Sequence, residues 1–179
     1  MPKSDNKHAV NMYNSLEKHI GREAADEFVE KLPLSKSADY QKRFKWAGDT
    51  CAWLEERFTD DDIKKMRAEC ACDPGGKAER AKKLYEASAD YDDFCAKFNS
   101  EFAPENTLTN DGSLLYFAYP KCYCSCVKRG GDVTRSWCVC TVGYTEKMFS
   151  RALSREVKVE LLESIKTGGT RCLMKITAK

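Results

Sequence analysis

The sequence predicts an α+β protein in which N-terminal helices pack on a C-terminal antiparallel sheet, with the order β-β-α-β-β in the second part. Two observations lead to this prediction. Residues 7–102 repeat apolar side chains at three- and four-residue steps, which is the helical period, whereas residues 113–177 contain aromatic and alternating runs separated by glycine turns. Helices followed by strands are typical of the α+β class. We expect a helical region, 1–106, and an α+β cysteine-rich region, 113–179, that together form one compact domain.

The helices of the first region are predicted from their apolar spacing and their end signals. Thr59 and Asp90 are good N-cap residues, and either Ser35 or Ser37 is expected to cap the helix that continues to Phe58. Gly21 is expected to mark a kink or a break in this helical run, which Pro33 ends. The predicted segments are 7–32, from Ser35 or Ser37 to 58, 60–69, 77–87 and 90–102.

The second region starts after an expected loop, 104–112. Residues 113–127 and 134–142 alternate in polarity around Gly130-Gly131, which predicts a hairpin. A short helix, 145–153, is expected to be capped by Thr145. Two further strands, 156–164 and 171–177, are predicted on either side of a Thr-Gly-Gly-Thr turn.

Composition excludes several classes of protein. The longest uncharged runs fall far short of the roughly 20 apolar residues needed to cross a bilayer, so no membrane association is expected. The N-terminus lacks the layout of a signal peptide, which predicts a cytoplasmic protein. Thirty Lys and Arg against 28 Asp and Glu give a net charge of only +2, whereas nucleic-acid binding calls for a basic stripe, so nucleic acid is not expected as a partner.

Ten cysteines are the unusual feature of the composition. In a reducing compartment, clustered cysteines more often bind metal or do redox chemistry than form disulfides. Because alternate residues of a strand point to one side, the predicted hairpin would present its cysteines in two sets. The sets are Cys122, Cys124 and Cys126 on one strand, and Cys138 and Cys140 on the other.

Whether the two sets share a face depends on the length of the turn. A loop with an odd number of residues puts them on one face, and a two-residue Gly-Gly turn puts them on opposite faces. Four thiolates within reach would hold zinc at about 2.3 Å each, or an iron–sulfur cluster in second place. A redox or disulfide role, and plain burial as small hydrophobes, remain open alternatives.

The remaining cysteines and the two histidines suggest less. Cys51 and Cys95 fall on apolar helix faces and are expected in the core. Cys70 and Cys72 lie at the end of a predicted helix, before Pro-Gly-Gly. Two roles stay open for them: additional metal ligands, or an exposed redox pair. His8 and His19 are expected on a helix surface, which leaves no histidine for a nucleophile–histidine catalytic pair. No catalytic residue is assigned.

The C-terminal 40 to 65 residues resemble the 4-vinyl reductase-like domain. The resemblance rests on the segment from Cys138 to Gly143-Tyr144, the acidic strand around Glu160, and a glycine turn followed by Cys172. That domain shares the ligand-binding fold of nitric-oxide-signalling and Golgi-transport proteins and of phenol-responsive sensors. The chain is also loosely similar to thiazoline-carboxylate hydrolases on the same fold. The resemblance implies a small-molecule ligand, and relatives on this fold commonly dimerise, so a homodimer is possible.

The resemblance also implies a zinc site, which the phenol sensors build beside their ligand pocket. Cys138 and Cys172 fall on ligand positions, and Glu160 matches the acidic ligand with a shift of one residue. Glu163 stands where the sensors have a cysteine, so Cys122, Cys124 or Cys140 would supply the missing thiolate. The function expected first is therefore a zinc-binding, small-molecule-binding sensor module. The alternatives are a hydrolase that acts on a small carbon–nitrogen substrate and a thiol-redox sensor.

Overall fold

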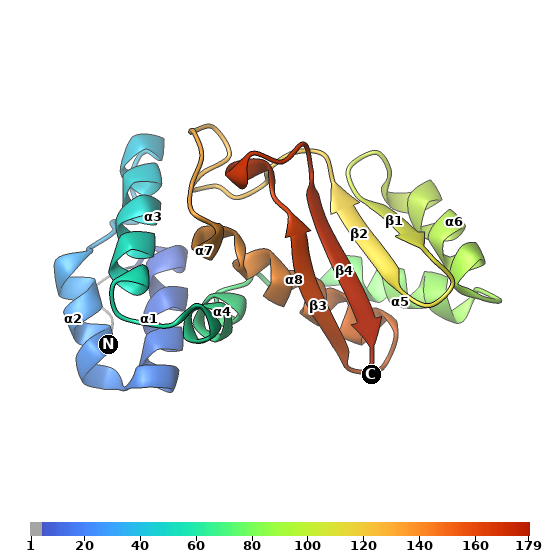
Figure 1. Cartoon of the computed structure of the whole chain (residues 1–179), viewed down its shortest axis with the longest axis horizontal. Helices are drawn as coiled ribbons and strands as arrows, with labels where there is room; N and C mark the ends of the chain where they lie inside the picture. The colour runs from blue at the N-terminus through green and yellow to red at the C-terminus, as the bar shows by residue number, and fades with distance from the viewer. Residues whose placement is uncertain (1–4) are drawn as a thin grey trace. The chain divides into compact units, whose positions relative to one another are not determined.

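The computed structural model describes residues 5–179, and these form two compact units. Unit 1 joins the residues up to Ala71 with Tyr123–Cys140, and unit 2 joins Cys72–Cys122 with Thr141–Lys179. Each unit therefore takes its residues from separate stretches of the chain. The predicted α+β class is confirmed, with helices towards the N-terminus and an antiparallel sheet towards the C-terminus (Figure 1).

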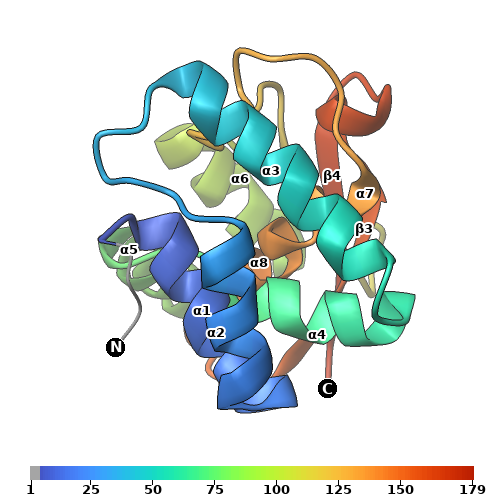
Figure 2. The same ribbon diagram turned by 90° about the vertical axis from the view of Figure 1, so that its left-hand side faces the viewer.

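Unit 1 is helical. Its elements are α1 (Lys7–Ile20), α2 (Arg22–Lys31), α3 (Tyr40–Glu55), α4 (Asp60–Glu69) and the short α7 (Arg135–Cys138). Helix α1 lies against both α2 and α4 (Figure 2). The core includes the fully buried Phe28, whose ring centroid lies 6.2 Å from that of Trp46 and 5.2 Å from that of Trp53.

Local end signals explain where these helices begin. Gly21, at φ 93°, separates α1 from α2, because a left-handed residue ends a helix and glycine adopts it at little cost. The Thr59 side chain accepts a hydrogen bond from the Asp62 amide, as expected of an N-cap. Helix α3 differs from the expectation: its N-cap is Asp39, which accepts from the Lys42 amide, rather than either serine.

Unit 2 holds the sheet, in the order β1-β2-β4-β3, with every neighbouring pair antiparallel. The strands are β1 (Thr107–Asn110), β2 (Leu115–Tyr119), β3 (Val157–Glu163) and β4 (Cys172–Ala178). The helices of this unit are α5 (Gly76–Glu86), α6 (Tyr91–Phe102), most of α8 (Cys140–Ala152) and the 3₁₀ turn η1 (Ile165–Thr167).

One face of the sheet is buried under α6 and α8. Phe117 pairs with Met174 across β2 and β4, and Met174 pairs with Leu161 of β3, so these alternate residues share that face. Phe98 of α6 and Phe149 of α8 meet Phe117 with ring centroids 6.1 and 5.3 Å from it. Aromatic side chains therefore hold the helices on the sheet.

The predicted loop 104–112 contains the edge strand β1. The Asn99 side chain of α6 accepts from the Leu108 amide at 2.7 Å and donates to the Leu108 carbonyl at 2.8 Å. These bonds satisfy backbone groups that a short strand at the edge of a sheet otherwise leaves to water. The Asn99 side chain thus satisfies hydrogen-bonding groups on the outer edge of β1.

The predicted cysteine hairpin is wrong. Residues 113–127 contain only the five-residue β2, and 120–134 form turns and irregular chain. Residues 134–142, predicted as a strand, form α7 and the start of α8. Helix α8 accordingly begins at Cys140, five residues before the predicted start. The order β-β-α-β-β nevertheless holds, because β1 and β2 stand in place of the hairpin.

None of the helices within residues 5–179 combines the length and the apolar composition needed to cross a bilayer.

Candidate functional site

The eight predicted metal ligands divide equally between the units. Four of the predicted ligands, all cysteines, belong to unit 1, and the other two predicted cysteines and both glutamates belong to unit 2. The first set is Cys124, Cys126, Cys138 and Cys140, and the second is Cys122, Cys172, Glu160 and Glu163. Within residues 5–179, no three His, Cys, Asp or Glu side chains are placed to hold a metal ion. The expectation of zinc is therefore wrong.

Secondary structure explains this correction. Cys138 ends α7 and Cys140 begins α8, and Val139 between them is also helical. Residues two apart on a helix project about 200° apart, so these two thiols cannot converge as they would on a strand. Cys122, Cys124 and Cys126 lie on irregular chain, where alternation sets no common side.

The predicted ligands of unit 2 serve the sheet. Glu160 is an exposed residue of β3 whose carboxylate lies 3.8 Å from Lys175 Nζ of β4. Glu163 accepts hydrogen bonds from the Thr170 and Arg171 amides, which lower the pKa of its carboxyl. Cys172 is buried on β4 opposite Tyr119 of β2.

Cys124 and Cys126 form the chemically distinctive part of unit 1. The Cys126 thiol and its backbone amide both donate to the Cys124 sulfur, and the indole Nε1 of Trp137 donates to it at 3.4 Å. Three donors on one sulfur favour its charged form. Cys124 is half-buried and Cys126 is fully buried.

These contacts set the protonation of the pair. The hydrogen bond from the Cys126 thiol, followed by that from Trp137, lowers the pKa of Cys124 well below its usual range. The same shared proton, together with burial, raises the pKa of Cys126. Burial raises the pKa of Cys51 and Cys70, and that of Cys140 to about 12. These contacts favour the thiolate form of Cys124, whereas burial favours the protonated form of Cys51, Cys70 and Cys140.

A buried arginine lies beside this cluster. Arg67 of α4 is 3% exposed, and its guanidinium carbon lies 4.2 Å from the centre of the Trp137 ring. It donates to the carbonyls of Ser136, at 3.3 Å, and Trp137, at 2.9 Å. Arg67 therefore fixes both the backbone and the ring of the residue that donates to Cys124.

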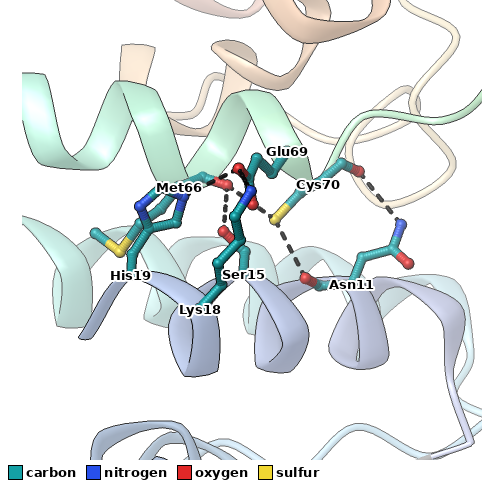
Figure 3. Close-up of polar contacts among 7 residues, drawn as sticks. All are labelled: Asn11, Ser15, Lys18, His19, Met66, Glu69 and Cys70. Atoms are coloured by element: carbon teal, nitrogen blue, oxygen red, sulfur yellow. Dashed lines mark hydrogen bonds and ion pairs between the residues drawn. The ribbon is translucent and has the colours of Figure 1, made fainter. Parts of the chain in front are cut away.

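Polar contacts join α1 to the part of α4 that carries Arg67 (Figure 3). The buried Ser15 hydroxyl of α1 donates to the Met66 carbonyl at 2.8 Å, one residue before Arg67. At the exposed side, Lys18 and His19 both reach Oε1 of Glu69, at 2.5 and 3.2 Å. Cys70, at the end of α4, donates to the Met66 carbonyl at 3.4 Å and points towards α1.

Sequence reasoning missed three residues of this site. His8 was expected on a helix surface, but it is half-buried, and its Nε2 lies 2.8 Å from the Ser125 hydroxyl, between the two cysteines. Burial lowers the pKa of His8, as do Arg67 and Arg43, against the opposite effect of Cys124. Arg67 and Arg43 carried no signal, because a lone arginine on a helix is normally solvated. The sequence pointed to this site only through the Cys-x-Cys spacing of Cys124 and Cys126.

The segment that carries the cysteine pair is anchored on α3. The Cys124 carbonyl accepts from the Val127 and Lys128 amides, at 3.1 and 2.9 Å, which forms a tight turn. The Arg129 amide then donates to the Tyr40 hydroxyl at 2.8 Å. A Cβ atom at Gly130 would lie 2.4 Å from the Phe44 ring, so glycine allows this close approach.

The backbone is similar to those of H-NOX domains, at low identity. An H-NOX domain of Shewanella oneidensis, a histidine-to-glycine mutant in the Fe(II)CO state, gives a TM-score of 0.48 with 13% identity over 97% of this chain and 98% of that one. The protein in its Fe(II)NO state gives 0.47 and 13% over 97% and 99%. A TM-score below 0.5 transfers no cofactor or residue role to this chain.

No curated protein matches this sequence. The sequence model of one family matches residues 3–179, which is nearly the whole chain, and that family is described as a family of unknown function, DUF6144. The chain therefore belongs to the DUF6144 family.

Proposed function

We propose that this protein is a thiol-based sensor of small-molecule oxidants, with Cys124 as the attacking thiolate and Cys126 as the thiol that resolves the product. The observation that carries the proposal is the donor set on Cys124: the Cys126 thiol, the Cys126 amide and the Trp137 indole. The thiolate is the nucleophilic form of cysteine, and partial exposure gives a reagent access to it.

The chemistry needs one oxidant, a hydroperoxide. The Cys124 thiolate attacks the terminal oxygen, the O–O bond breaks, and the leaving alkoxide or hydroxide takes a proton from water. Cys124 is then a sulfenic acid. The Cys126 thiol attacks that sulfur, forms the S–S bond, and its proton leaves with the hydroxyl as water. The two thiols lose two electrons, and the peroxide gains them.

The position of the pair supports a sensor rather than a structural role. A bond between the two sulfurs replaces the thiolate to which Trp137 Nε1 donates with a neutral disulfide sulfur, which is a weaker acceptor. The turn that begins at the Cys124 carbonyl and the anchor at Tyr40 lie a few residues further along the same segment. Oxidation therefore changes a segment, 123–134, that a partner can read.

The test is peptide mapping of the whole protein after treatment with hydrogen peroxide. Trypsin releases residues 122–128 as one peptide, which contains all three cysteines of this segment. We expect this peptide to lose two hydrogens, with fragment ions that place the bond between Cys124 and Cys126. Cys122→Ser is the matched control and should retain the bond.

The variant Cys126→Ser separates attack from resolution. It should leave Cys124 as a sulfenic acid that a 1,3-dione probe traps, because no resolving thiol remains. If peroxide leaves Cys124 reduced while it oxidises another cysteine first, the proposal is wrong.

The remaining expectations stay predictions. These are the 4-vinyl reductase-like resemblance of the C-terminal part, the hydrolase alternative, the cytoplasmic location, the homodimer and the absence of a nucleic-acid partner. Oxidant-dependent modification of Cys124 separates the sensor from the hydrolase, which would instead turn over a small carbon–nitrogen substrate without consuming an oxidant.

A further inference from the structure

Arg67 is a buried cation without a carboxylate in contact. Its donors reach two carbonyl oxygens and, at 3.8 Å, the Met12 sulfur. In the described part of the chain, no Asp or Glu forms an ion pair with it, and its side chain is 3% exposed. Burial of an uncompensated guanidinium is costly, so the position needs either a counter-charge or a function.

The titratable groups that favour the charged form of Arg67 are thiols. Cys70, Cys140, Cys51 and Cys124 are the side chains that favour its charged form, in that order. Burial raises the pKa of three of these thiols, whereas hydrogen bonds lower the pKa of Cys124, so we assign the negative charge beside Arg67 to Cys124. A thiolate in this position balances the guanidinium, and the guanidinium in turn stabilises the thiolate.

We propose that Arg67 is a positioning residue that determines the reactivity of Cys124 and favours anionic reagents at that sulfur. It acts through Trp137: the guanidinium lies on the indole ring and binds its carbonyl, and the indole nitrogen donates to Cys124. It also supplies a positive charge inside the protein, where screening by salt is weak. The biological role of this inference rests on the proposed function, whereas its test does not, because alkylation of Cys124 requires no oxidant.

The other charged and titratable groups that face the pair come from every neighbouring element. His8 of α1 acts on Cys124 and Arg43 of α3 acts on Cys126, while Cys124 in turn raises the pKa of Cys140 of α8. Arg43 Nε is buried without a hydrogen-bond partner. The Arg43 guanidinium is therefore a second positive charge that acts on the cysteine pair. The hydrogen-bond donors Cys126 and Trp137 act on Cys124 directly, and Arg67 adds a buried positive charge beside them.

The experiment measures alkylation of Cys124 by mass spectrometry of peptide 122–128, with no oxidant present. Iodoacetate and iodoacetamide react by the same displacement of iodide, but only the first is an anion. For the unaltered protein, we expect the ratio of their rate constants to exceed the ratio for a small neutral thiol, 2-mercaptoethanol. Salt should reduce this excess little, because the charge is buried.

Arg67→Met removes the charge at similar length. We expect the midpoint of the pH–rate profile to rise by about one unit, and the rate below the midpoint to fall about tenfold. The reagent ratio should fall towards that of 2-mercaptoethanol. Arg67→Lys keeps the charge and should restore most of the ratio, which a purely structural role would not predict.

The proposal is overturned if Arg67→Met folds and leaves both the profile and the ratio unchanged. If that variant fails to fold, the measurement on the unaltered protein tests the inference. A ratio of iodoacetate to iodoacetamide rate constants no higher than that of 2-mercaptoethanol refutes it. Because no oxidant is used, failure to form the Cys124–Cys126 disulfide would count against the proposed function alone.

Discussion

Replacement of Trp137 by phenylalanine tests the donor on which the thiolate depends. Phenylalanine keeps an aromatic face under Arg67 but has no N–H, so the 3.4 Å contact with the Cys124 sulfur is lost. A hydrogen bond to a charged group contributes about 1.5–3 kcal/mol. At 1.36 kcal/mol per unit, the pKa of Cys124 should rise by about one to two units.

The assay is the rate of alkylation of Cys124 by iodoacetamide across the pH range, with folding checked by thermal melting. Trp46→Phe is the matched control. Trp46 is also buried in unit 1, and its ring centroid lies 5.7 Å from that of Trp137, but its N–H donates to the Leu32 carbonyl at 2.9 Å. A Trp137→Phe protein that folds and has the same midpoint as the control would refute the reasoning.

Three further predictions concern stability. Phe98→Ala should lower the free energy of unfolding by about 3–5 kcal/mol, because the ring is fully buried among aromatic neighbours; a urea titration that shows a loss below about 1 kcal/mol would contradict this. Ser15→Ala should cost about 1 kcal/mol, since the buried bond to the Met66 carbonyl is lost, and an unchanged denaturation midpoint would argue against that bond. Thr59→Ala should also cost about 1 kcal/mol through loss of the N-cap, measured by thermal melting, with Thr59→Ser expected to retain most of the stability.

The helices of the first region could be predicted because their signals are local. The spacing of apolar residues and the caps at Thr59 and Asp90 act within one or two turns of chain. Asp39 replaced the expected serines as N-cap because the three candidates lie within five residues, and their sequence does not rank them. The signals for β3 and β4 were equally local, because buried and more exposed residues alternate along each strand.

Residues 134–142 could not be predicted because tertiary contacts override their local preference. Aromatic and β-branched residues favour a strand there. Trp137 is instead buried against Trp46 and under Arg67, which a helical turn permits. Thr145 shows the same effect: it was expected as a cap, but it is buried inside α8, and its hydroxyl donates to the Thr141 carbonyl one turn earlier.

The sequence predicted the cysteines of the candidate site but not the residues that surround them. The Cys-x-Cys spacing identified the sulfur atoms, and a redox role was among the open alternatives. The partners that decide between metal binding and thiol chemistry come from α1, α4 and α7, and no sequence spacing relates those elements to Cys124.

The discontinuous make-up of unit 1 has a consequence for biosynthesis. The guanidinium of Arg67 leaves the ribosome long before the carbonyls of Ser136 and Trp137 that receive it. Until translation reaches that stretch, the nascent N-terminal helices have an unmatched cation and no reactive sulfur pair. The chemistry proposed for this protein is therefore acquired only when the second stretch of unit 1 folds back onto the first.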